Sequence, residues 1–184
     1  LSYTEFTREL VTSDIELTGK SFDDTVSVEV KVTNVGTASG KEVVQLYIHA
    51  PYTAGGIEKP EVALAGFAKT QTLAPGVSET ISVSVRVGDI ASYDWNDLNS
   101  DGWYGYEIEA GDYELRLQKN SHELIEALPF SVAETIKFTG DGALASGVNT
   151  PADTVFSTGD DFDTLALVSG ENGGSFTVMS RADF

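Results

Sequence analysis

The sequence contains no cysteine. This absence excludes a disulfide framework, a thiolate zinc site, an iron–sulfur centre and a cysteine nucleophile within the chain. It does not fix the cellular compartment, because a chain of 184 residues can bury a hydrophobic core without disulfides. Cytoplasmic and secreted locations therefore both stay open.

Basic residues are scarce: 11 Lys and Arg stand against 29 Asp and Glu, giving a formal net charge of −18. Nucleic acids and anionic membranes attract cationic surfaces, so we predict neither as a partner. Long apolar runs are also missing. A membrane-spanning helix needs roughly 20 apolar residues, so we expect none in this sequence. Residues 1–20 lack a basic start followed by an apolar stretch, and we expect no signal peptide.

The sequence instead shows apolar and polar residues in alternation, the pattern of a β-strand with one buried face. The clearest case is residues 24–33, where four valines occupy every second position. Similar patterns or short apolar runs predict further strands at residues 43–48, 81–87, 113–117 and 124–132, with weaker ones at 14–17 and 63–72. Because no segment has an amphipathic helix pattern, we predict an all-β, immunoglobulin-like antiparallel β-sandwich of about seven strands.

Two features refine this prediction. Residues 109–115 have the layout of a tyrosine corner, in which Tyr113 enters the sixth strand and Leu115 stands where an antibody domain carries its second cysteine. Residues 134–184 differ in composition, with seven Gly and eight Asp and Glu among short apolar pieces. We therefore expect a sandwich domain over residues 1–133, followed by an extended Gly-rich linker with one or two short strands.

The order of these segments resembles the fibronectin type III-like domain that closes the polypeptide of family-three glycoside hydrolases, mostly β-glucosidases. The matching stretches are residues 1–6 (LSYTEF), 32–36 (VTNVG) with 39–48, 60–69 with 73–78, and 109–117. The resemblance implies a fibronectin type III-like fold and, as partners, the catalytic domains of the same polypeptide. It implies contact with a β-glucoside or oligosaccharide only through the parent enzyme.

The end of the chain is similar to a different part of the family. Residues 165–184, which end in TVMSRADF, resemble the connector of permuted members in which the sandwich domains precede the (β/α)8 barrel. This resemblance implies that residues 134–184 lead to a following catalytic barrel.

We predict no catalytic residue in this chain. In the resembling family the nucleophilic aspartate belongs to the barrel, and the acid/base usually belongs to the α/β sandwich domain. Asp183 does not match the context of that nucleophile, and we interpret it as a linker residue. His49 and His122 lack a partner nucleophile at a recognisable spacing, so we expect a strand-end histidine and a turn histidine.

The connection between Asp89 and Asp112 carries the remaining candidate site. It holds both tryptophans, three tyrosines and seven acidic residues, without Lys or Arg. Aromatic faces can stack on sugar rings while carboxylates accept hydroxyl hydrogen bonds. The alternative is that the aromatic residues belong to the core or to a contact between domains. We predict Trp95, Trp103 and Tyr104 as substrate-rim or interdomain residues.

The same connection contains half of a calcium-loop pattern. Asp97, Asn99 and Asp101 fall at alternate positions before a glycine, as in the first half of such a loop. The second half fails, because position twelve is Ile108, flanked by Glu107 and Glu109. An Asn-Ser-Asp-Gly turn between two strands explains the same residues without metal. We therefore predict no cofactor and no metal, with calcium as the alternative.

Together these observations predict a non-catalytic accessory domain of a β-glucosidase-like glycoside hydrolase. It would brace the catalytic domains and contribute a loop to the substrate entrance. Two alternatives stay open: an autonomous carbohydrate-binding module, favoured by an exposed flat row of aromatic rings, and a structural or adhesive sandwich of a surface protein.

Overall fold

The computed structural model describes residues 3–94, 97–139 and 180–183. The chain divides into two compact units. The sandwich unit comprises residues 1–51, 61–90 and 111–133, and the hairpin unit comprises residues 52–60, 91–110 and 134–184. Within the described ranges no helix is long and apolar enough to cross a membrane.

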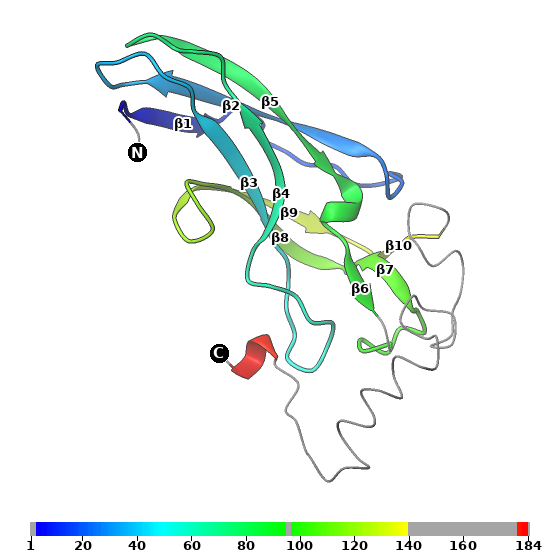
Figure 1. The fold of residues 1–184 in the computed structure, drawn as a ribbon. Helices are drawn as coiled ribbons and strands as arrows, with labels where there is room; N and C mark the ends of the chain where they lie inside the picture. Colours follow the sequence, from blue (N-terminus) through cyan, green and yellow to red (C-terminus); the bar gives the residue numbers. More distant parts are fainter. Residues whose placement is uncertain (1–2, 95–96, 140–179, 184) are drawn as a thin grey trace, which may run out of the picture. The chain divides into compact units, whose positions relative to one another are not determined.

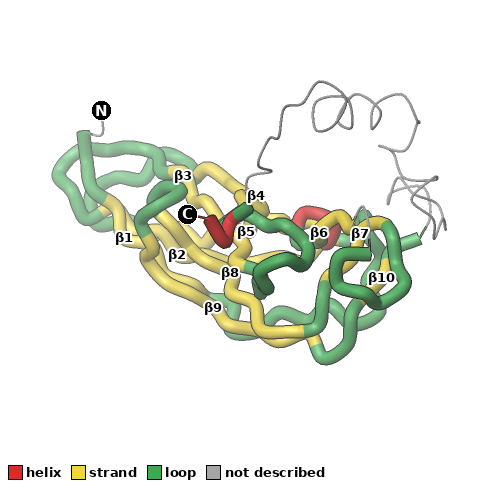
Figure 2. The backbone as a smooth tube through the Cα atoms, turned by 90° about the horizontal axis from the view of Figure 1, so that it is seen from below, coloured by secondary structure: helices red, strands yellow, loops and turns green. Residues whose placement is uncertain are grey.

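The sandwich unit contains two antiparallel sheets (Figures 1 and 2). The first has the order β1 (Phe6–Leu10), β2 (Thr25–Asn34), β5 (Ser78–Arg86). The second has the order β4 (Ala63–Lys69), β3 (Val43–His49), β8 (Gly111–Gln118), β9 (Leu124–Val132). The predicted all-β fold, a fibronectin type III-like sandwich, is confirmed.

The core of the sandwich unit follows from the alternation along β2. Val28, Val30 and Val32 are fully buried, whereas the residues between Val26 and Val32 at the other positions are exposed. The second sheet supplies fully buried side chains to the same core, namely Val44, Leu46, Leu115 and Leu117. Burying each valine contributes about 1.5–3 kcal/mol relative to leaving it exposed. The valine face of β2 therefore accounts for a large share of the stability of this unit.

The two sheets approach each other closely at Gly66 of β4. A Cβ atom at this position would lie 2.7 Å from the carbonyl oxygen of Ser84 on β5 and 3.1 Å from Cγ1 of Val83. The pairing of β3 with β4 also shifts here, because Leu46 pairs with Gly66 whereas Tyr47 pairs with Leu64. Only glycine fits this approach without displacing backbone.

A buried asparagine ends β2 and organises the following turn. Asn34 has no exposed surface. Its Nδ2 donates to the carbonyl oxygens of Ala38 and Leu73, both at 2.8 Å. Its Oδ1 accepts from Thr4 Oγ1 at 2.8 Å and from the Gly36 amide at 3.0 Å. The side chain thus satisfies all its hydrogen-bonding capacity, as a buried amide must.

The sequence prediction fails at two places in the sandwich unit. Residues 14–17 form no strand, although Ile15 and Leu17 are buried. Their backbone bonds to local side chains instead: Ile15 N donates to Asp14 Oδ1, and Thr18 N donates to Glu16 Oε1. Strand β1 was not predicted, because apolar and polar residues alternate only weakly in its sequence. In the structure its inward positions are half-buried.

The predicted tyrosine position lies inside the core. Tyr113 on β8 is 2% exposed, and its ring stacks on Phe130 of β9 with centroids 5.3 Å apart. These two residues also pair in the strand register. In a tyrosine corner the tyrosine hydroxyl also bonds to the backbone a few residues upstream, and for Tyr113 this hydrogen bond stays a prediction.

The hairpin unit contains a small antiparallel sheet of order β10 (Ile136–Lys137), β7 (Gly105–Ile108), β6 (Ser92–Asp94). The connection between Asp89 and Asp112 therefore contains a β-hairpin formed by β6 and β7, which agrees with a turn between two strands at Asn-Ser-Asp-Gly. Ser180 and the short 3-10 helix Arg181–Asp183 are the last described residues. The rest of the predicted linker, residues 140–179 and 184, lies outside the described residues.

We expect Val30→Ala to lower the free energy of unfolding by about 2 kcal/mol, because it removes two buried methyl groups and leaves a cavity. Val43→Ala is the matched control, since Val43 is 37% exposed on β3. Urea unfolding followed by far-ultraviolet circular dichroism, which reports the β-sheets, measures both changes. Equal midpoints for the two variants would contradict the buried face assigned to β2.

Candidate functional site

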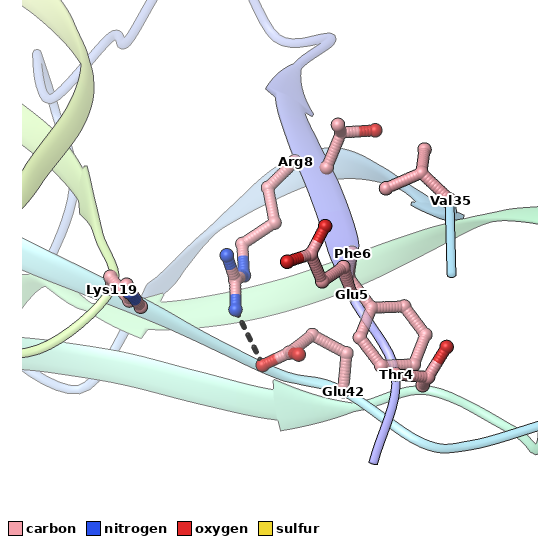
Figure 3. A pocket seen from close by; sticks show the side chains of 8 residues that line it. Thr4, Glu5, Phe6, Arg8, Val35, Glu42 and Lys119 are labelled. Carbon is pink, nitrogen blue, oxygen red and sulfur yellow. Dashed lines mark ion pairs between the residues drawn. The ribbon is translucent and has the colours of Figure 1, made fainter. Parts of the chain in front are cut away.

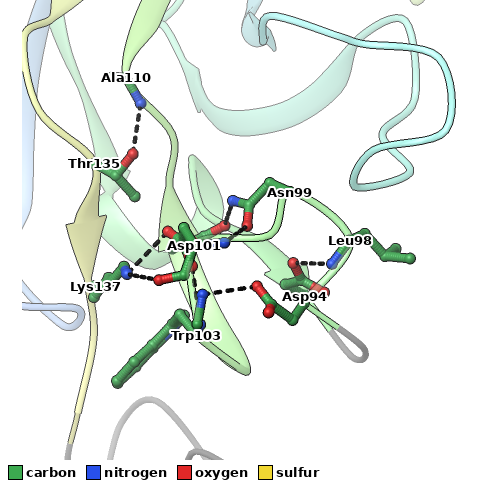
Figure 4. A network of polar contacts seen from close by, with 11 residues as sticks. Asp94, Leu98, Asn99, Asp101, Trp103, Ala110, Thr135 and Lys137 are labelled. Atoms are coloured by element: carbon green, nitrogen blue, oxygen red, sulfur yellow. Dashed lines mark hydrogen bonds and ion pairs between the residues drawn. The ribbon is translucent and has the colours of Figure 1, made fainter.

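The turn between β6 and β7 is held by its own polar side chains (Figure 4). Asp97 Oδ1 accepts from the Gly102 amide at 2.9 Å, and Asn99 Oδ1 accepts from the Asp101 amide at 3.2 Å. Asp97 and Ser100 adopt positive φ angles of 51° and 60°, a conformation that aspartate tolerates better than most residues. The residues of the half calcium-loop pattern therefore shape this turn.

A buried carboxyl group lies against the turn. Glu107 on β7 has no exposed surface. Its Oε1 accepts from Asn99 Nδ2 at 2.5 Å, while its Oε2 has no hydrogen-bond partner among the described residues. An unpaired buried carboxylate oxygen is costly, because it has lost its water without a replacement. The sequence marked Glu107 only as a flanking residue of the calcium pattern.

Burial and nearby acids disfavour ionisation of this group. Burial is the largest cause, followed by the negative charges of Asp101, Glu109 and Asp94, and together they raise the pKa of Glu107 from its ordinary 4.5 to about 8. The hydrogen bond from Asn99 opposes this rise. Glu107 therefore carries a proton at neutral pH, in contrast to an ordinary glutamate.

Two lysines pair with other acids of the hairpin unit. Lys137 Nζ lies 2.9 Å from Asp101 Oδ2 and also donates to the Asp101 carbonyl at 3.3 Å (Figure 4). Lys59 pairs with Glu109, and its side chain is only 4% exposed. These lysines come from outside the acidic connection, so the sequence order did not reveal either pairing.

The described aromatic residues of this hairpin are partly covered. Trp103 is 8% exposed, and Lys137 Nζ lies 5.8 Å from its ring centroid. Tyr93 and Tyr106 pack edge to face with centroids 4.9 Å apart, and Tyr104 is half-buried. Trp103 thus offers no open ring face, and its substrate-rim or interdomain role, like that of Tyr104, stays a prediction. Trp95, the third predicted residue, lies outside the described residues.

The last described residues contact the loop of residues 52–60. The Arg181 guanidinium lies 4.8 Å from the centroid of the Tyr52 ring, and Tyr52 Oη lies 2.9 Å from Ser180 Oγ. The Arg181 amide donates to Glu58 Oε2 at 3.2 Å. The hydrogen bond from Ser180, with that from the Arg181 amide, lowers the pKa of the Glu58 carboxyl. No sequence pattern predicts this contact, because more than 120 residues separate its two sides.

The other residues considered from the sequence lie at a strand end, in a turn and in the 3-10 helix. His49 ends β3, where its Nδ1 lies 2.8 Å from the Glu61 carbonyl oxygen. His122 is exposed in the turn before β9, and its amide donates to Asn120. Asp183 is the last residue of the 3-10 helix. In the described part of the chain, no group of three or more His, Cys, Asp or Glu side chains is placed so that it could hold a metal ion.

A shallow pocket in the sandwich unit was not predicted from the sequence. It is lined by residues of the first strand and its neighbours, namely Thr4, Glu5, Phe6, Thr7, Arg8, Val35, Glu42 and Lys119. The side chains of Arg8 and Glu42 point toward each other across it and form an ion pair of 2.7 Å (Figure 3). The charges of Arg8 and Glu42 therefore neutralise each other within the pocket.

Comparison with known families identifies the class of this domain. The sequence profile of the fibronectin type III-like domain matches residues 42–121, which include β3, β4, β5 and β8. The match agrees with the two-sheet architecture of the sandwich unit. The chain thus contains a fibronectin type III-like domain.

The relatives of this domain are β-glucosidases, the family-three glycoside hydrolases that the sequence resembles. The chain is 37% identical to a β-glucosidase of Ruminococcus albus over 73% of its own length, and 40% identical to β-glucosidase A of Butyrivibrio fibrisolvens over 64%. Among solved structures, a Paenibacillus barengoltzii β-glucosidase superposes with a TM-score of 0.63 at 36% identity over 77% of this chain.

The chain spans a small part of each relative. It covers 13% of the Ruminococcus protein, 15% of the Butyrivibrio protein and 16% of the Paenibacillus chain. Most of each β-glucosidase therefore has no counterpart in this sequence.

We expect the stability of the protein to fall as pH rises from about 4.5 to about 8. The pKa of Glu107 is raised in the folded state, so its stabilising contribution is complete below its unfolded value and is lost as pH rises through the folded value. The slope from this one group is at most about 1.4 kcal/mol per pH unit. Urea unfolding at successive pH values measures this slope.

The isosteric variant Glu107→Gln should reduce this slope and be more stable than the original protein at pH 8. Glu134→Gln is the matched control, because it makes the same change of carboxyl to amide at an exposed position. If the pH profile of Glu107→Gln coincided with those of the original protein and the control, the raised pKa would be refuted.

Proposed function

We propose that this chain is a non-catalytic accessory domain of a β-glucosidase-like glycoside hydrolase, where it braces the catalytic domains of the same polypeptide. One observation carries the proposal: 73% of this chain aligns with a β-glucosidase of which it covers only 13%. A segment that aligns over most of its own length with a small share of an enzyme corresponds to one domain of that enzyme. The substrate class that follows is a β-glucoside or oligosaccharide, bound by the parent enzyme.

The roles of the described carboxylates support a non-catalytic domain. A retaining glycosidase needs one carboxylate as nucleophile and another as acid/base. In the hairpin unit Asp97 caps the turn, Asp101 and Glu109 pair with lysines, and Glu107 is fully buried. These groups maintain the fold, which agrees with catalytic carboxylates that belong to other domains.

Exposed apolar side chains support a bracing role. Phe67 and Leu64 on β4 are 69% and 50% exposed, and β4 is the edge strand of the second sheet. In the strand register they pair with Gln45 and Tyr47 of β3. Large apolar side chains that gather on one face mark a contact surface more often than isolated ones do. This face of β4 and β3 is our candidate contact with a catalytic domain.

The aromatic hairpin supports a contact role more than an independent sugar site. A carbohydrate-binding module needs open ring faces, whereas Trp103 is buried beneath Lys137. We therefore propose that the β6–β7 hairpin, with Trp103 and Tyr104, lies at the substrate entrance or at a domain contact of the parent enzyme.

The isolated chain should hydrolyse no aryl-β-glucoside, because it lacks the domains that carry the catalytic carboxylates in the resembling family. Release of p-nitrophenol from p-nitrophenyl-β-glucoside measures this directly. Turnover that survives repurification and disappears in a single Asp or Glu variant would refute the non-catalytic assignment.

In the complete β-glucosidase polypeptide, Phe67→Asp should lower the temperature of irreversible inactivation by several degrees, since a charge would be buried at the contact. Val77→Asp adds the same charge at a 46% exposed position and should change little. Calorimetry and residual activity after heating measure both. Equal inactivation temperatures for the original enzyme and Phe67→Asp would overturn the proposed contact face.

A further inference from the structure

We propose that the loop of residues 52–60 is a docking site for Ser180 and Arg181 of the same chain. We call this loop, which connects β3 and β4, the docking loop. The loop and residues 180–183 belong to the same compact unit, the hairpin unit. Docking would fix the point on this unit from which the chain continues past residue 180. This docking site is independent of the accessory role proposed above.

The docking loop is held in shape by contacts that do not involve residues 180–183. The Gly56 amide donates to the Thr53 carbonyl oxygen at 3.0 Å, and Gly55 between them has a φ angle of 83°, which glycine adopts readily. Ile57 and Lys59 are buried, with exposures of 2% and 6%. A preformed loop binds a partner at a smaller entropic cost than a loop that must be ordered.

Two side chains of the docking loop stay available at its surface. Tyr52 is half-buried and Glu58 is exposed. The Arg181 guanidinium lies over the Tyr52 ring, while the Tyr52 hydroxyl contacts Ser180 Oγ and also donates to Glu58 Oε1 at 3.3 Å. Glu58 in turn accepts from the Arg181 amide. One tyrosine and one acid therefore contact the ring-facing cation, the hydroxyl and the backbone of the docked pair.

Charge favours this particular partner. From residue 138 to residue 184 the sequence has one Lys or Arg, which is Arg181, against seven Asp and Glu. A segment with this excess of negative charge is repelled by a chain whose formal net charge is −18, so its contact depends on its cation. The face of an aromatic ring attracts a guanidinium, and Glu58 adds a negative group beside it.

Ser180 couples docking to the structure that follows it. Its Oγ accepts from the Ala182 amide at 3.1 Å, within the start of the 3-10 helix Arg181–Asp183, and the same oxygen lies 2.9 Å from Tyr52 Oη. One hydroxyl therefore joins the docking loop to the helix. For this reason docking would fix the direction of the chain after residue 180 as well as its position.

Docking also carries an entropic cost. The Phe138 amide donates to the Tyr106 carbonyl oxygen at 3.0 Å, so residue 138 is held on the hairpin unit too. Holding Ser180 on the same unit restricts the chain between these residues, at a cost that grows with its length. We therefore expect residues 180–183 to be released more easily than the sheets unfold.

The test is limited proteolysis of the full chain with trypsin, which cleaves after Arg181. A docked helix withholds this bond from the protease, whereas a free end exposes it. The rate at which intact mass loses residues 182–184 is divided by the cleavage rate of a synthetic peptide of residues 176–184. We expect the chain to be cleaved at least about fivefold more slowly than the peptide. Equal rates for the chain and the peptide would overturn the proposal.

Variants of one tyrosine identify the docking loop as the cause of protection. Tyr52→Ala removes both the ring and the hydroxyl, so cleavage should approach the rate of the peptide. Tyr52→Phe keeps the ring and should give an intermediate rate. Tyr3→Ala is the control, because Tyr3 is 85% exposed in the sandwich unit. Far-ultraviolet circular dichroism should show the same urea midpoint for all of them. Full protection in both Tyr52 variants would overturn the proposal.

A second pair of variants tests the partner side without altering the docking loop. Ser180→Ala should speed cleavage of the chain, whereas Ser180→Thr keeps the hydroxyl and should not, each rate being divided by that of the matching peptide. Equal protection in Ser180→Ala and Ser180→Thr would contradict the role of the hydroxyl. Protection that increases with protein concentration would assign the contact to a second copy and overturn docking within one chain.

Discussion

The buried valine face of β2 is the constraint on which the sandwich unit depends. Strand β2 pairs with β1 on one side and β5 on the other, so its pleat sets the register of the whole first sheet. A shift of one residue would expose Val28, Val30 and Val32 and bury charged side chains such as Glu29. Asn34 then fixes the end of the strand, because its four hydrogen bonds join the following turn, the Leu73 backbone and the side chain of Thr4.

The hairpin unit depends on polar contacts, namely hydrogen bonds to side-chain oxygens and ion pairs with two lysines. Its turn is built by side-chain oxygens that accept backbone hydrogen bonds, and its acidic groups are partly neutralised by Lys59 and Lys137. Glu107 is left buried with one unpartnered oxygen. A cost of this kind is more common at functional positions than in a purely structural turn. The two units therefore differ in character: one is stabilised by apolar packing and the other by polar contacts.

This difference bears on the biological role. A fibronectin type III-like sandwich can host many functions, so its fold alone does not define one. What connects this chain to β-glucosidases is its alignment with several of them, each over a small share of the enzyme. Within such an enzyme, an apolar sheet face that includes Phe67 suits a fixed domain contact, and a polar hairpin suits a surface that meets solvent or ligand.

Several elements could be predicted from the sequence because their signals are local. The alternation of residues 24–33 predicted β2, the Asn-Ser-Asp-Gly residues predicted a turn, and the ordered fragments predicted the domain class, which the comparisons confirm. The environment of Glu107, the lysines beside Asp101 and Glu109, and the Arg181–Tyr52 contact depend on residues distant in sequence. Only the tertiary structure decided these features, because burial and charge pairing arise from which segments the fold brings together. The sequence by itself determined the strands with strong alternation, such as β2, and their buried faces, since a period of two acts within each segment.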